Sequence, residues 1–258
     1  MPGERHPVHG RDVTAIRRAD RGIDVLVTCE HGGNRIPRRY RRWFEGCDRL
    51  LASHRGYDPG ALAMAHSLAQ ALGAPLMAAT VSRLLVELNR SLRHPDLFST
   101  VMRAAPEDVR GELLERYYLP YRYAVTRWVE VRIARGRRVL HVSSHSFAPV
   151  FRGVRRNADV GLLYDPSRRL EVRLCGLWRR AMLQRAPAWT VRRNYPYQGR
   201  SDGLVTTLRR TFPASRYAGI ELEMNQSLAR RQPAAFAQAR RLVPRALRDA
   251  VRCVSDAP

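Results

Sequence analysis

The pattern of apolar and polar positions starts, near the N-terminus, with a short apolar run that predicts a buried strand over residues 25–28. A polar segment containing two glycines, Glu30-His31-Gly32-Gly33, follows this run directly. In an open α/β sheet, ligands bind beyond the carboxyl ends of the strands. The end of this strand is therefore the first candidate position for a functional site.

Helices are predicted where apolar residues recur every three or four positions between start and stop signals. The clearest has Asp58 as its N-cap, Pro59 at its first position and Gly73 just past its end. Pro120 is expected to break or kink the second helix, and Pro244 lies inside the last. The other predicted helices span residues 106–135, 167–184 (capped by Ser167) and 233–251.

Further strands are expected over residues 75–80, 84–88, 139–143, 160–164 and 220–224. Strands separated by helices predict an α/β fold, with a largely parallel or mixed sheet covered on both faces. The chain contains no internal repeat, linker or composition change that would mark a boundary. We therefore expect one domain over residues 1–258.

The formal net charge of +23 raises the question of nucleic-acid binding, because cationic surfaces release counterions from phosphate backbones. All 46 lysine-or-arginine positions are arginine and are spread along the chain, which is typical of a GC-rich coding bias. No nucleic-acid-binding motif is present. We expect no specific nucleic-acid partner, although non-specific binding to polyanions at low salt is consistent with the charge.

No apolar stretch approaches the length of a membrane span, so we expect no membrane partner. The first 24 residues are charged and lack the apolar segment of a secretory signal. The four cysteines are scattered without the spacing of a disulfide frame or a zinc motif. These features favour a cytoplasmic protein; they leave its oligomeric state open.

Two of the eight histidines, His31 and His145, lie where a predicted strand runs into a loop. His141 precedes His145 by four residues in the same strand, about 13 Å away along an ideal strand, so those two cannot share a metal ion. A catalytic zinc ion needs three protein ligands of the nitrogen or oxygen type. With His31 and His145 as two ligands, the candidates for the third are Asp58, Asn34 and Glu30.

A metal-activated water also needs a general base, and residues 220–224 offer two. Glu221 and Glu223 share one face of this predicted strand, whose other face is apolar. Arg83 and Arg90, with Asn89, bracket residues 84–88 and are suited to binding an acidic substrate, because arginine binds carboxylates bidentately. The loop that begins at Asn194 has polar side chains suited to lining a pocket.

In order along the chain, these segments resemble the N-formylglutamate amidohydrolase family over about residues 25–230. The segments that carry the resemblance begin with Glu30 to Pro37, Tyr57 to Ala61 and Ser82 to Arg90. The others are His145 to Pro149, Arg156 to Tyr164, Asn194 to Gly199 and Gly219 to Gln226. The family is similar in turn to the zinc carboxypeptidases, which implies a three-layer αβα sandwich with a mixed sheet and one catalytic Zn²⁺.

The resemblance also implies roles for individual residues. His31 and His145 would bind zinc, and Asp58 would replace the glutamate of the carboxypeptidase His-x-x-Glu motif, whose position here is Asn34. Asn89 and Arg90 resemble the pair that holds a substrate carboxylate and polarises the scissile carbonyl, and Glu223 matches the general base. Arg156 and Asn194 are further pocket candidates.

The resulting hypothesis is a zinc-dependent amidohydrolase that releases formate from N-formyl-L-glutamate, or the acyl group from another N-acyl acidic amino acid. One alternative keeps the chemistry and changes the substrate to another N-acyl amino acid or a small peptide. A second alternative is a non-enzymatic, arginine-rich protein that binds polyanions on a hydrolase-like fold.

Overall fold

The computed structural model describes residues 22–255, and a mixed sheet of six strands lies at its centre. The strands lie in the order β2 (Leu76–Ala78), β1 (Ile23–Cys29), β3 (Arg138–Phe147), β8 (Tyr217–Asn225), β6 (Val160–Leu163) and β7 (Val191–Arg193). The first four strands in this order are parallel, β6 is antiparallel to β8, and β7 is parallel to β6. The predicted mixed, mostly parallel sheet is confirmed. The first 21 residues, part of the stretch expected to lack a secretory signal, lie outside the described residues.

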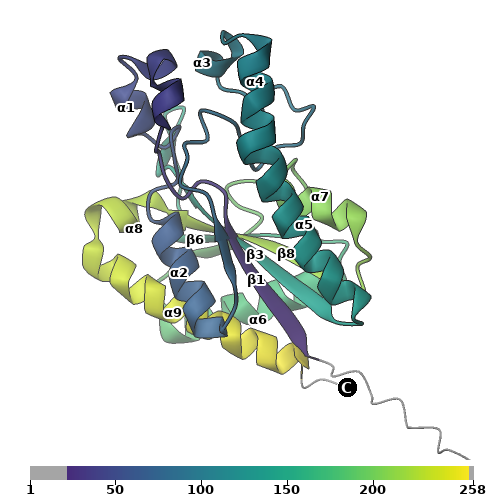
Figure 1. Cartoon of the computed structure of the whole chain (residues 1–258). Helices are drawn as coiled ribbons and strands as arrows, with labels where there is room; N and C mark the ends of the chain where they lie inside the picture. The colour runs from purple at the N-terminus through teal and green to yellow at the C-terminus, as the bar shows by residue number, and fades with distance from the viewer. Residues whose placement is uncertain (1–21, 256–258) are drawn as a thin grey trace, which may run out of the picture.

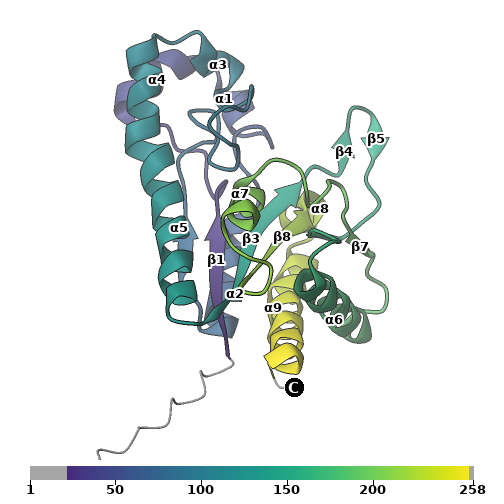
Figure 2. The same cartoon turned by 90° about the vertical axis from the view of Figure 1, so that its right-hand side faces the viewer.

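Helices cover both faces of the sheet (Figures 1 and 2). One face packs against α2 (Ala61–Leu72), α6 (Arg169–Arg185) and α9 (Pro233–Ser255). The other packs against α5 (Leu119–Ala134) and α7 (Leu204–Thr211). This arrangement is the predicted αβα sandwich. Within the described part of the chain, no helix has both the length and the hydropathy needed to cross a bilayer.

A third group of buried side chains forms a cap, which we define as residues 36–51 and 84–118, beyond the carboxyl ends of the parallel strands (Figure 1). Its short elements are η1 (Arg38–Phe44), α1 (Asp48–Leu51), α3 (Thr100–Arg103), α4 (Glu107–Leu113) and the π-helical turn η2 (Leu114–Tyr118). The remaining elements are the hairpin β4 (Val150–Phe151) and β5 (Val154–Arg155), and α8 (Gln226–Arg231). The cap covers one side of the carboxyl edge of the sheet.

The predicted strand over residues 84–88 is wrong, because this segment forms turns in the cap. The Ser82 hydroxyl accepts a hydrogen bond from the Leu84 amide at 3.2 Å, and the Glu87 amide donates to Leu97 O at 2.9 Å. Its apolar side chains are buried in the cap rather than in the sheet. Burial of an irregular segment gives the same short apolar run as a buried strand, so periodicity could not separate the two.

Two of the predicted helix starts are also wrong. α2 begins at Ala61, with Gly60 as an N-cap in the left-handed region (φ 85°), so Pro59 lies outside the helix and Asp58 does not cap it. α6 begins at Arg169, and the Ser167 hydroxyl donates to the Asp165 carboxylate instead. The Asp58 carboxylate pairs with His31, His145 and Arg83 instead.

Both prolines lie in helical segments, as the sequence pattern predicts. Pro120 lies in the first turn of α5, immediately after the π-helical turn that separates α5 from α4. Its missing N–H is tolerated in a first turn, where the amide has no intrahelical partner. Pro244 lies inside α9.

His141 is a buried residue of β3 that belongs to the core rather than to any site. Its Nδ1 lies 2.8 Å from the Tyr217 hydroxyl and its Nε2 lies 2.8 Å from the Thr28 hydroxyl. Burial lowers the pKa of His141 to about 4. The charge of Glu30 opposes this shift, and the nearby cations Arg209, His145 and Arg122 reinforce it. The imidazole is therefore neutral at pH 7.

This pKa predicts a pH dependence of stability. Between pH 6.5 and 4 the unfolded chain binds a proton at His141 that the folded protein does not, so stability falls as the pH falls through this range. The contribution lost is about 3 kcal/mol. Denaturant unfolding at several pH values should show a flatter dependence for His141→Gln than for the wild type. The exposed His66→Gln is the control, and parallel curves for wild type and His141→Gln would contradict the prediction.

Candidate metal centre

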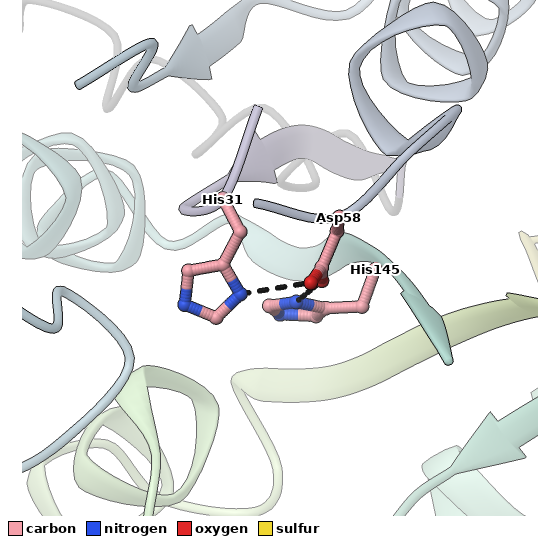
Figure 3. Close-up of side chains that lie close together, drawn as sticks. All are labelled: His31, Asp58 and His145. Carbon is pink, nitrogen blue, oxygen red and sulfur yellow. Dashed lines mark hydrogen bonds and ion pairs between the residues drawn. The ribbon is translucent and has the colours of Figure 1, made fainter. Parts of the chain in front are cut away.

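Three side chains from different elements converge at the carboxyl edge of the sheet (Figure 3). His31 follows β1, His145 lies near the end of β3, and Asp58 lies just before α2. Because β1 and β3 are parallel neighbours, their carboxyl ends meet at one edge. The Asp58 amide donates to His31 O at 2.9 Å, which fixes the loop before α2 against the end of β1.

The three side chains form a compact set of metal-ligand type. Asp58 Oδ2 lies 3.2 Å from His31 Nδ1 and 3.0 Å from His145 Nδ1. One potential ligand atom from each residue lies within 4.8 Å of the others, and all three residues are buried. Two imidazole nitrogens and one carboxylate oxygen are the donor types of a catalytic zinc site.

The second ring nitrogen of each histidine is held by a carboxylate. His31 Nε2 contacts Glu87 Oε1, and His145 Nε2 lies 3.2 Å from Glu30 Oε2. Metal-binding histidines commonly pair their other ring nitrogen with a carboxylate, which fixes the orientation of the ring. In both residues, Nδ1 is thereby left facing Asp58, on the inside of the set.

The electrostatics of the set suit a cation. Burial alone would raise the pKa of Asp58, but the two histidines and Arg83 hold it well below its usual range. Burial would likewise lower the pKa of His145, but Asp58 and Glu30 raise it well above its usual value. Without a metal, the proton on the His145 imidazole partly balances the buried carboxylates. A divalent cation would replace this proton, as metal binding to histidine does in general.

Glu223 lies beside this set, since its Cα is the ladder partner of His145 Cα in β8. The side chain is buried, and its Oε2 has no hydrogen-bond partner among residues 22–255. Burial raises the pKa of Glu223 to about 8, opposed by the charge of His145. Glu221, on the same face of the strand, is more exposed. A buried carboxylate oxygen without a partner is a place for a water molecule or a substrate proton.

The two other ligand candidates lie apart from the set. Asn34 is exposed, and its amide donates to Leu51 O at 3.1 Å. Glu30 faces the outer nitrogen of His145 and also accepts hydrogen bonds from the hydroxyls of Ser143 (2.5 Å) and Tyr121 (3.0 Å). Of the three residues considered as third ligand, Asp58 alone belongs to the convergent set.

The predicted substrate-binding residues of the cap border the set. Arg83 donates to Glu87 from Nε at 2.6 Å and to Asp58 at 3.3 Å, and its side chain remains 26% exposed. Asn89 Nδ2 lies 3.4 Å from His145 Nε2, and its Oδ1 accepts from the Leu204 amide at 2.7 Å. The structure therefore brings Arg83 and Asn89 to the metal set.

The other predicted residues lie further out in the hydrogen-bond network. Arg90 donates to Asp202 O at 2.7 Å, and Arg156 donates to the Tyr197 hydroxyl at 3.1 Å. Asn194 Oδ1 accepts hydrogen bonds from the amides of Tyr164 and Gly199, which holds the loop that it begins. Binding of substrate by these residues stays a prediction.

Glu87 is the site residue that sequence reasoning missed. A carboxylate within an apolar run, four residues after Arg83, was the available signal. The sequence pattern predicts a strand for this run, and that prediction gives Glu87 no partner. In the structure Glu87 contacts both His31 and Arg83.

Glu87→Gln tests the outer carboxylate contact. The change keeps the size of the side chain but removes the negative charge that orients His31, so we expect metal affinity to fall by about 10–100-fold. Competition with a chromophoric chelator measures this affinity. Glu115→Gln, at an exposed position of η2, is the matched control. Equal affinities of Glu87→Gln and wild type would contradict the orienting role.

A buried His–Asp–His set at the carboxyl edge of this sheet defines an α/β protein with a metal-type site. The sequence profile of the N-formylglutamate amidohydrolase family matches residues 23–229. The chain belongs to the N-formylglutamate amidohydrolase family.

Solved structures agree with this fold. A gene product from Agrobacterium tumefaciens is 29% identical, with a TM-score of 0.77, over 90% of this chain and 92% of that one. An N-formylglutamate amidohydrolase from Ralstonia eutropha is 23% identical, with a TM-score of 0.65, over 90% of this chain and 95% of that one. No curated protein sequence matches this chain significantly.

Proposed function

We propose that the protein hydrolyses the amide bond of an N-formyl or N-acyl acidic amino acid, with N-formyl-L-glutamate as the first candidate. The observation that carries this proposal is the convergence of His31, Asp58 and His145 beside the unpaired carboxylate of Glu223. Family membership and the name of the similar protein from Ralstonia eutropha support the choice of substrate.

Zn²⁺ is the cofactor that the donor set fits. His31, Asp58 and His145 would hold it, with Glu30 and Glu87 fixing the two rings from outside. When bound, a zinc ion supplies a Lewis acid that polarises an amide carbonyl and lowers the pKa of water towards about 7.

The protein's own residues supply the proton transfers. In the proposed reaction the ionised form of Glu223 accepts a proton from water, and the water oxygen forms a bond to the acyl carbon. The bond between that carbon and nitrogen then breaks, and Glu223 returns the proton to the leaving nitrogen. For N-formyl-L-glutamate, the products are formate and glutamate.

The acidic part of the substrate needs cationic partners. Arg90 with Asn89 would bind a substrate carboxylate and orient the scissile carbonyl, and the exposed part of Arg83 would add a further positive charge. Arg156, stacked on the Tyr197 ring at 4.9 Å, and Asn194 are proposed for the outer part of the pocket.

The experiment is formate release from N-formyl-L-glutamate by zinc-loaded protein, with and without a chelator. Release that the chelator stops and added zinc restores would support the proposal. Folded, zinc-loaded protein that releases no formate would overturn the assignment of this substrate. A panel of other N-acyl amino acids and dipeptides would then test the alternative in which the chemistry is kept and the substrate differs.

A further inference from the structure

Arginine side chains of the C-terminal helix α9 line one groove. The groove lies between α2 and α9, which run beside each other on one face of the sheet (Figure 1), and has a volume of about 460 Å³. Its polar lining consists of Ser67, Gln70, Arg240, Arg241, Arg245 and Arg248. None of these residues belongs to the metal centre.

The positive charge of the groove is not balanced by the protein. The helix α2 contains no acidic residue, and α9 contains one, Asp249, which pairs with Arg185 of α6 at 2.5 Å. No carboxylate in the described part of the chain pairs with Arg241, Arg245 or Arg248. The buried Nε of Arg248 also has no hydrogen-bond acceptor there. Several neighbouring guanidinium groups without counter-charges repel one another, and a bound polyanion would relieve this repulsion.

The spacing of these arginines places their positive charges in a row along α9. Positions 241, 245 and 248 are four and three residues apart, so they lie on one face of α9. At a rise of about 1.5 Å per residue they extend over about 10 Å of helix axis. Guanidinium groups bind phosphate oxygens bidentately, so such a row suits a ligand with regularly repeated phosphates.

The surroundings of the groove narrow the class of ligand. The large apolar side chains that are exposed, among them Tyr123, Phe151 and Tyr197, lie outside its lining. Membrane binding by a surface helix needs apolar side chains that enter the bilayer, and binding of unpaired bases needs aromatic stacking. The groove lining contains no aromatic and no large apolar side chain, but its guanidinium groups suit contact with phosphates.

We infer that the α2–α9 groove binds the phosphate backbone of a nucleic acid without reading its sequence. This inference is independent of the proposed hydrolase activity. It agrees with the expectation that the chain has no sequence-specific nucleic-acid partner, and it assigns the non-specific affinity to one face of the molecule.

The test measures binding of a labelled, random-sequence DNA duplex by fluorescence anisotropy over a range of salt concentrations. Each arginine–phosphate contact contributes about 0.9 to the slope of log K against log salt. The triple variant Arg241→Gln/Arg245→Gln/Arg248→Gln should therefore show a slope about 2.7 less steep than the wild type. Its affinity at about 50 mM salt should be at least about tenfold lower.

Two variants keep the test specific. The triple exchange to lysine at the same positions keeps the charge and should keep most of the slope. The triple exchange of Arg38, Arg41 and Arg49 to glutamine removes the same charge from exposed positions of the cap, and should change binding much less. Thermal melting checks that each variant is folded.

Several results would overturn the inference. They are no binding to wild type at about 50 mM salt, an equal loss of binding in the cap and groove variants, and unchanged binding in the groove variant. Poly-L-glutamate that competes as well as DNA would show a general acidic partner instead and would also overturn it. His145→Ala should bind DNA like the wild type, which separates this test from that of the hydrolase.

Discussion

Glu223→Gln is expected to lower the turnover of N-formyl-L-glutamate by about 10²–10⁴-fold, the usual contribution of a general base. Glutamine has the same shape but cannot accept the proton of the attacking water. The metal content should stay at the wild-type value, because Glu223 is not a member of the His31–Asp58–His145 set. Measurement of kcat on zinc-loaded protein, together with metal analysis of the same sample, checks both parts.

Glu221→Gln is the matched control, since Glu221 lies on the same face of β8 two residues earlier. Its side chain is more exposed than that of Glu223, and we expect turnover to change by less than about tenfold. Full activity in Glu223→Gln together with a large loss in Glu221→Gln would transfer the role of base to Glu221. Wild-type turnover in both variants would exclude this pair as the source of the base.

Asp58→Asn is expected to abolish both stoichiometric metal binding and hydrolysis. The carboxylate of Asp58 joins the two histidines through Oδ2, so its replacement by a neutral amide removes the one negatively charged ligand of the set. Loss of an outer contact costs about 10–100-fold in metal affinity, and loss of a ligand should cost more. Metal content after dialysis, measured by mass spectrometry, and formate release are the two readouts.

Asn34→Ala provides the comparison for this variant. The Asn34 side chain is exposed and donates to a cap carbonyl, so its removal should leave metal content and turnover near the wild-type values. An Asp58→Asn protein that retains one tightly bound metal ion would show that another residue completes the site. A melting curve for each variant distinguishes loss of metal from loss of fold.

The elements that the sequence predicts well are those whose local pattern of residues has a single physical cause, such as burial of one face of a strand. Alternation along β8 separates the core residues Ile220, Leu222 and Met224 from Glu221 and Glu223 on the other face. The strands β1 and β3 are each recognisable from their local sequence, and their parallel pairing brings His31 and His145 to one edge of the sheet. The two histidines could therefore be predicted as partners from their positions at strand ends.

Other features depended on contacts between distant segments and could not be predicted from local patterns. Asp58 has the sequence context of a helix cap, but its carboxylate is occupied by His31, His145 and Arg83, and α2 begins later. Glu87 lies in an apolar run that resembles a strand, although the run packs into the cap. In both places the carboxylate pairs with a histidine distant in the sequence, a contact that no local pattern reveals.

The order of strands in the sheet has a consequence for how the protein folds during synthesis. β1 emerges first, but its neighbour β3 follows only after more than a hundred further residues, as the ladder pair Thr28 and Ser143 shows. β8, which carries Glu223, comes later still. Parallel pairing across such long loops is slow, because the loops must be closed before the contacts stabilise them. A nascent chain interrupted between residues 146 and 216 therefore contains all three residues of the His31–Asp58–His145 set but lacks the central strand β8 and Glu223.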